Sequence, residues 1–234
     1  MKLRLRYSKL GKVRFTSHRD TARVWERAMR RAGVPVATSA GFTPRPRLSF
    51  GLALPTGAES VAEYLDLEVV DGAMADDDVD ALPARLDDVL PIGFAAMAAA
   101  WRGPGGGSLQ EDVTAVTWEL TVPGAVDARG AVERVLAAAT LPLERERKGE
   151  RRVDDVRPAI QALVVSGDGA DRLIASVSTV GRGLRPAELA AVAFPGADVT
   201  ALRALRTHQW IEHDGNRREV MALPVAVPAP LAGA

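Results

Sequence analysis

Apolar and polar residues alternate at the start of the chain, where Leu3, Leu5 and Tyr7 stand between basic residues. This period of two predicts a β-strand. An amphipathic stretch follows, and Ser17 with Asp20 three positions later has the pattern of a capped helix start. The first half therefore predicts a strand from residue 2, extended structure over 13–15, a helix over 18–32, extended segments at 48–52 and 64–70, a helix over 76–90 and a strand over 93–101.

The second half repeats this order of elements. Trp118, Leu120 and Val122 alternate with polar residues, and Asp127 is placed to cap a helix. The expected elements are a strand over 114–122, a helix over 127–139, strands over 141–148, 159–165 and 172–179, a helix over 186–193 and a strand over 200–212. We interpret this as the ferredoxin-like βαββαβ order occurring twice. The expected fold is α+β, with two tandem ferredoxin-like βαββαβ sandwiches that each carry helices on one face of an antiparallel sheet.

The clearest linker is the sequence GPGGGS, from Gly103 to Ser108, because a run of glycines loses much backbone entropy on ordering and has no side chains to pack. The end of the chain is rich in Pro and Ala. The expected domains are an N-terminal ferredoxin-like domain with a basic helix over 1–102, a Gly-rich linker over 103–112, a C-terminal ferredoxin-like domain over 113–222 and a disordered tail over 223–234.

Composition excludes several classes of site. The chain has no cysteine, so it holds no disulfide, no Cys-ligated zinc and no iron–sulfur cluster. No apolar run approaches the ~20 residues needed to span a bilayer, and the first residues lack the apolar core of a secretory signal. We expect a cytoplasmic protein without membrane association, with no metal site and no cofactor bound by this chain.

The net charge is zero, but the charges are unevenly distributed. Residues 1–50 contain 13 Lys and Arg against two carboxylates, whereas residues 51–100 contain 11 carboxylates against one arginine. Two interpretations follow. The basic part forms a surface for a polyanion, or the acidic segment over 59–88 folds back on it and neutralises it.

The arginines of the first predicted helix share one side. At 100° per residue, Arg19, Arg23, Arg27 and Arg30 fall within an arc of about 80°, and Trp25 falls on the opposite side. The helix has only two carboxylates of its own, so the row requires another anion. That anion is either the acidic segment or the phosphates of an external polyanion.

A second basic element is the loop from Gly41 to Gly51. Pro44 and Pro46 stiffen it, and the i,i+2 spacing of Arg45 and Arg47 projects both side chains to one side. A stiff loop loses little entropy on binding, and arginine suits phosphate bidentately. The alternative is a rigid turn whose arginines meet the acidic residues of the chain.

Two further candidates are weaker. A basic run over 143–158 ends with Arg157, but its interleaved glutamates favour cross-strand pairing in a hairpin. His18 is either a partly buried residue at the helix start or, beside Ser17 and Tyr7, a general base acting on RNA.

Several short motifs resemble those of a known family. They are Arg14-Phe-x-Ser17-His18-x-Asp20, Gly41-Phe-x-Pro44-Arg45-Pro46, Leu54-Pro55-x-Gly57 and Glu63-Tyr64-x-Asp66, followed by Lys148-Gly149 and Asp155-Val156-Arg157-Pro158. Over residues 1–220 the chain resembles the radical-SAM-linked protein family, DUF2344. The resemblance implies a partner more than a reaction: a radical S-adenosylmethionine protein, fused to the domain or encoded beside it. Without the three-cysteine motif, this chain cannot itself cleave S-adenosylmethionine.

We therefore expect a non-catalytic accessory module that binds a structured RNA for a separate radical S-adenosylmethionine protein. One alternative is a protein–protein adaptor that docks the same partner. The other is a metal-independent RNA-processing enzyme that uses His18. The expected polyanion-binding residues are Arg19, Arg23, Arg27, Arg30, Arg45, Arg47 and Arg157.

Overall fold

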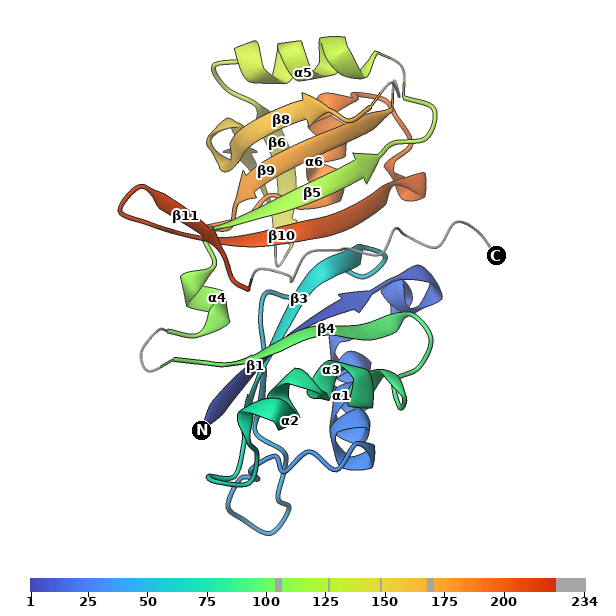
Figure 1. Ribbon diagram of the computed structural model, residues 1–234. Coiled ribbons are helices and arrows are strands. Elements are labelled where there is room, and N and C mark those ends of the chain that lie inside the picture. The colour runs from blue at the N-terminus through green and yellow to red at the C-terminus, as the bar shows by residue number, and fades with distance from the viewer. Residues whose placement is uncertain (104–106, 126, 148, 168–170, 222–234) are drawn as a thin grey trace.

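The computed structural model describes residues 1–103, 107–125, 127–147, 149–167 and 171–221 (Figure 1). The predicted tail over 223–234 and the centre of the predicted linker, residues 104–106, lie outside this part of the chain. The first half contains β1 (Lys2–Lys9), the 3-10 helix η1 (Gly11–Phe15), α1 (His18–Arg31), β2 (Leu48–Phe50), β3 (Glu59–Glu68), α2 (Asp76–Asp80), α3 (Leu82–Asp87) and β4 (Phe94–Trp101).

The second half begins with a short helix inside the predicted linker. Its elements are α4 (Leu109–Asp112), β5 (Ala115–Thr121), α5 (Ala128–Ala137), β6 (Pro142–Arg147), β7 (Glu150–Asp155), the 3-10 helix η2 (Arg157–Ala159), β8 (Ile160–Val165), β9 (Arg172–Ser178), α6 (Pro186–Ala193), the 3-10 helix η3 (Val199–Ala201), β10 (Arg203–His213) and β11 (Asn216–Glu219).

A single sheet of nine strands runs through both halves in the order β4-β1-β3-β10-β5-β9-β8, with β2 paired to β3 and β11 paired to β10. The halves join where β3 and β10 pair in parallel, at Leu205 with Glu59 and Arg206 with Ser60. β6 and β7 form a separate hairpin. The α+β class is confirmed, and the sheet is mostly antiparallel. The two separate sheets that a pair of sandwiches would have are instead joined into one.

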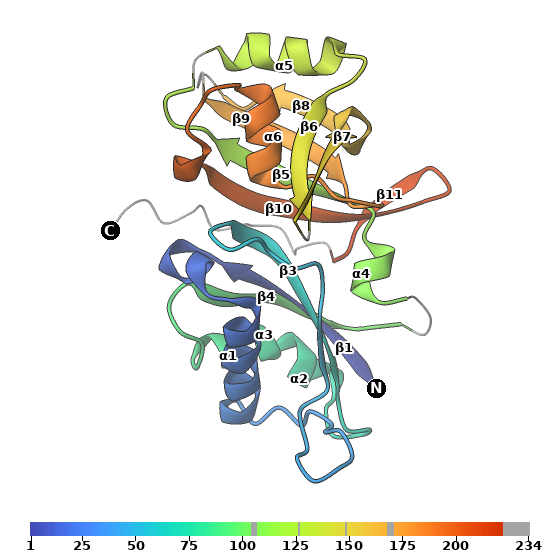
Figure 2. The same cartoon turned by 180° about the vertical axis from the view of Figure 1, so that it is seen from behind.

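The alternation of apolar and polar residues along β1 places one row of side chains in the hydrophobic core of the first half. Leu3, Leu5 and Tyr7 point to the side covered by α1, α2 and α3, and the Tyr7 ring lies 4.7 Å from that of Trp25. Figure 2 shows these helices beside the strands of the first half, with α5 and α6 in the second half. In the described part of the chain no helix has the length and apolar character needed to cross a bilayer; the longest, α1, has 14 residues.

Several expected local structures differ. The single helix expected over 76–90 is divided into α2 and α3, and the strand expected over 200–212 begins only at Arg203, after η3. Residues 13–15, expected to be extended, belong to η1, where Gly11 adopts a φ of 68° that turns the chain after β1. Residues 109–112, assigned to the linker, form α4, because Leu109 is buried in the second-half core and packs close to Gly51. The linker therefore contributes an apolar contact between the halves.

Buried polar contacts reinforce the junction of β3 and β10. Both Nε and Nη2 of Arg206 donate to Oε1 of Glu63, at 2.9 and 2.6 Å, and the two side chains are only 2% and 6% exposed. Arg6 of β1 donates to Glu219 of β11 at 2.7 Å. Gln209 of β10 donates to the carbonyl of Ala62. A buried guanidinium held in this way fixes the relative position of the halves.

We expect Arg206→Met to lower the free energy of unfolding by about 3–5 kcal/mol, because it leaves the Glu63 carboxylate buried without its cation. Urea denaturation measures the change. The matched control on the same strand is Arg203→Ala. Arg203 is 67% exposed and lies 3.6 Å from Glu59, so its loss is expected to cost at most about 1 kcal/mol. Equal costs for the two variants would contradict the structural role of the buried pair.

Candidate functional site

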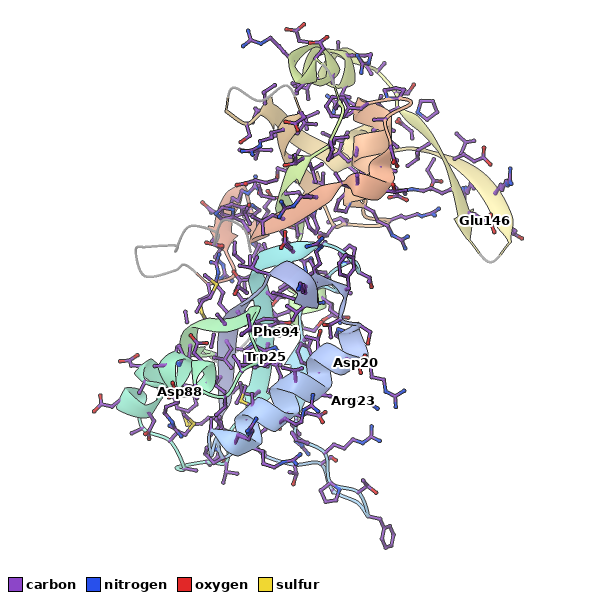
Figure 3. All side chains as sticks on the ribbon, turned by 90° about the vertical axis from the view of Figure 1, so that its right-hand side faces the viewer. Asp20, Arg23, Trp25, Asp88, Phe94 and Glu146 are labelled. Carbon is purple, nitrogen blue, oxygen red and sulfur yellow. The ribbon has the colours of Figure 1, made fainter. Side chains whose placement is uncertain are left out.

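The α1 helix separates its apolar and basic residues onto opposite sides. Ser17 caps it by accepting a hydrogen bond from the Asp20 amide at 3.1 Å, as the capping pattern predicts. Trp25 and Met29 are buried against the sheet, and Figure 3 shows Trp25 on the inner side with Asp20 and Arg23 on the outer side. The exposed arginines of α1, called the arginine ridge here, are Arg19, Arg23, Arg27, Arg30 and Arg31.

Only one ion pair involves the arginine ridge in the described part of the chain. Arg23 Nη1 lies 3.1 Å from Oδ1 of Asp20, and both side chains are 54% exposed. The hydrogen bond from Ser17, together with Arg23, lowers the pKa of the Asp20 carboxyl. Arg27 and Arg30 form no ion pair with any described residue. The ridge therefore presents a strong excess of positive charge to solvent.

Several carboxylates of the acidic segment form ion pairs away from α1. Asp66 accepts a bidentate pair of hydrogen bonds from Arg4 at 2.7 and 2.9 Å, and Glu63 is held by Arg206. Asp71 pairs with the N-terminal ammonium group. These partners belong to the strands and the chain terminus. Among the described residues, the segment over 59–88 does not neutralise the arginine ridge.

The loop after α1 carries the second predicted basic element. Thr38 bridges to Pro46, and the Ser39 amide donates to the Arg45 carbonyl at 2.9 Å, so the loop is folded on itself. Phe42 is fully exposed, and Arg45 is exposed with no ion pair to a described residue. Figure 2 shows this part of the chain at the same end of the first half as the C-terminus of α1.

Arg47 differs from Arg45. Its Nη1 lies 2.7 Å from Oε2 of Glu68, and this contact lowers the pKa of the Glu68 carboxyl. Arg47 also lines a cleft of about 640 Å³ together with Lys2, Arg102 and Asp66. Because the cleft is lined by both signs of charge, it is a mixed surface rather than a cationic groove.

Arg157 is not brought together with the first-half arginines. It lies in η2 of the second half, where its guanidinium donates to the carbonyls of Ile160 and Leu136, each at 3.1 Å. On the neighbouring hairpin, Arg145 is buried and pairs with Glu188 at 2.8 Å. Carbonyls and carboxylates of this half therefore occupy both guanidinium groups.

His18 is exposed at the first turn of α1, and its ring meets the edge of Phe50 at 5.3 Å. The sequence also allowed His18 to be partly buried. Its side chain is exposed because the first turn of α1 lies at the rim of the core. Beside His18 is a small polar cavity, lined in part by Tyr7, Lys9 and Glu63. Sequence reasoning missed this cluster, because only the pairing of Tyr7 with Glu63 across β1 and β3 brings it together.

Burial controls the protonation of the groups in the polar cavity. Desolvation, reinforced by the nearby Glu63 carboxylate, raises the pKa of the Tyr7 hydroxyl well above its usual value. Desolvation also lowers the pKa of Lys9, whose amine donates to the Thr16 carbonyl at 2.7 Å. No group of three or more His, Asp or Glu side chains within the described residues has the arrangement of a metal site.

Comparison with known proteins supplies one match. A family model described as "Uncharacterized protein conserved in bacteria (DUF2344)" covers residues 2–186. No curated protein matches the chain.

The cap that places the arginine ridge can be tested directly. We expect Ser17→Ala to lower the free energy of unfolding by about 1 kcal/mol, because the Asp20 amide loses its acceptor at the helix start. Ser49→Ala, at an exposed serine on β2, is the control and is expected to change stability by less than about 0.5 kcal/mol. Chemical denaturation followed by circular dichroism measures both. An unchanged S17A midpoint would contradict the capping role.

Proposed function

The chain belongs to the DUF2344 family, and we propose that it is an accessory module that binds a structured RNA and works with a separate radical S-adenosylmethionine protein. The arginine ridge and the exposed Arg45 form the RNA-binding surface. The module positions the RNA, and the radical chemistry belongs to the partner, because these 234 residues contain no cysteine to hold an iron–sulfur cluster.

One observation carries the RNA-binding part of the proposal: apart from the pair of Arg23 with Asp20, the arginines of the ridge form no ion pair with a described residue, although the following segment is rich in carboxylates. Like charges on neighbouring turns of a helix repel each other. Their retention on one exposed face favours an external anion, and a phosphate backbone supplies several anions at regular spacing. Arginine also binds phosphate oxygens through two parallel hydrogen bonds.

The loop beside the C-terminal end of α1 extends this surface. Its internal hydrogen bonds hold Arg45 outward, so little entropy is lost when the loop binds. The exposed Phe42 ring offers a stacking surface for an unpaired base. A structured RNA with both phosphates and looped-out bases fits these two features better than a uniform duplex does.

We also propose that each half is a ferredoxin-like sandwich. In the first half the sheet order is β4-β1-β3-β2, and in the second half it is β10-β5-β9-β8. If the strands of each half are numbered in chain order, and β6 and β7 are set aside as an insertion, both halves have the sheet order 4-1-3-2. This agreement supports the duplicated arrangement, and the pairing of β3 with β10 then joins the two units.

We expect Arg23→Ala combined with Arg27→Ala to weaken binding to a hairpin RNA. The slope of log K against log salt should fall by about 2, because two phosphate contacts are lost. The control combines Arg129→Ala with Arg172→Ala, which removes two exposed arginines from the second half. Fluorescence anisotropy over a salt series measures both. Equal slopes for wild type and the first pair would refute the ridge as the RNA surface.

The partnership is tested separately. We expect a radical S-adenosylmethionine protein from the same genome to be retained by the immobilised chain, and RNase treatment to reduce the retained amount because RNA bridges the two. Retention that is unchanged by RNase but lost in the Arg23→Ala, Arg27→Ala variant would replace RNA binding with direct adaptor docking through the same surface. No retention under either condition would remove the partner from the proposal.

A further inference from the structure

The polar cavity lies at the N-terminal end of α1, next to the start of the arginine ridge. Its polar lining comes from Tyr7 and Lys9 of β1, His18 and Thr21 of α1, and Glu63 of β3, and its apolar lining includes Phe50, Leu52 and Leu54. Its free volume is about 20 Å³, which holds a single oxygen-sized group and excludes a nucleobase or a larger cofactor. Any ligand must therefore insert one small group.

Three polar groups around this cavity have no hydrogen-bond partner among the described residues. The Thr21 hydroxyl is one, and its residue is only 4% exposed. The Tyr7 hydroxyl is another, on a residue that is 3% exposed. The third is Oε2 of Glu63, because Arg206 donates twice to Oε1. The Thr21 hydroxyl is buried and therefore costly without a partner, and the two other unpaired groups belong to residues that line the same cavity, so together they indicate a ligand.

The chemistry of these groups defines that ligand. The Tyr7 side chain is a neutral hydroxyl at neutral pH, as an ordinary tyrosine is, so it can donate or accept, and burial raises its pKa further. Glu63 Oε2 accepts, and Thr21 does either. The ligand group must both donate and accept within the space of one oxygen atom, which fits a water molecule or the hydroxyl of a larger ligand. Phosphate is too large, and an ammonium group cannot accept.

We propose that the polar cavity binds a ribose hydroxyl of the RNA that lies along the arginine ridge, and so distinguishes RNA from DNA. This inference rests on the proposed function. His18 is exposed at the rim of the cavity, and Arg19 follows it as the first member of the ridge. A phosphate bound by Arg19 would lie one residue from His18, which brings its ribose near the opening of the cavity.

The experiment measures binding of three hairpins of one sequence: RNA, DNA and 2′-fluoro RNA. The 2′-fluoro hairpin retains the RNA sugar pucker but has no 2′-hydroxyl, so it separates helix shape from hydroxyl recognition. For the wild-type chain we expect RNA to bind about tenfold more tightly than either analogue, which corresponds to about 1.4 kcal/mol. DNA and 2′-fluoro RNA should keep the same salt dependence as RNA, because the phosphate contacts remain.

Tyr7→Phe and Thr21→Val each remove one hydroxyl and keep the side-chain shape. Both are expected to reduce the preference for RNA to about twofold and to leave DNA binding unchanged. The thermal midpoint is expected to stay the same or rise, because each variant removes a buried group without a protein partner. Thr179→Val is the matched control, because Thr179 lies in the second half, does not line the cavity, and its hydroxyl donates to the Val113 carbonyl at 2.6 Å. This control should keep the full preference.

The outcomes separate the inference from the proposed function. Equal, salt-dependent binding of RNA and DNA by the wild type would overturn the hydroxyl site and leave the arginine ridge as a polyanion surface. Tight binding of 2′-fluoro RNA, or an RNA preference that survives both Tyr7→Phe and Thr21→Val, would also overturn it. Absence of binding to all three hairpins would overturn the site and the proposed function together.

Discussion

The structure depends on the buried ion pair between Arg206 and Glu63. β3 and β10 pair over only two residue positions, which by itself is a weak connection between two halves of a chain. The guanidinium of Arg206 adds two hydrogen bonds to Glu63 and one to the Leu52 carbonyl, and it lies over the Trp118 ring at 5.4 Å. Because a buried charge cannot lose its partner without a large penalty, this contact keeps the two halves in one arrangement.

The same carboxylate shapes the polar cavity. Arg206 of the second half donates to Oε1 of Glu63, and Glu63 pairs with Tyr7 across the β1–β3 ladder and lines the cavity with it. The geometry of the cavity is therefore fixed by a residue of the other half. A movement of β10 relative to β3 would shift Glu63 and change the cavity at the end of the arginine ridge, which couples the position of the second half to the proposed RNA surface.

The helices and strands were predictable from the sequence, but the pairing of the strands and the contacts of the buried arginines were not. The cap of α1, its limits and the exposure of the arginine ridge follow from Ser17, Asp20 and the helical period, and the structure agrees with them. Sheet pairing over more than a hundred residues has no local signal. No local pattern marks Arg206 and Glu63 as a buried pair, and no pattern in the sequence distinguishes Arg157, which binds carbonyls, from Arg45, which faces solvent.

The uneven charge of the first hundred residues has a structural explanation. The acidic segment neutralises arginines on the strands, where Arg4 and Arg206 would otherwise be buried without a counter-ion. Burial makes those pairings necessary, whereas an exposed arginine on α1 is already solvated and gains little from an ion pair. The carboxylates are therefore used where desolvation is greatest. The arginine ridge keeps its positive charge because neutralising it would contribute little to folding, and this leaves the charge available to an external anion.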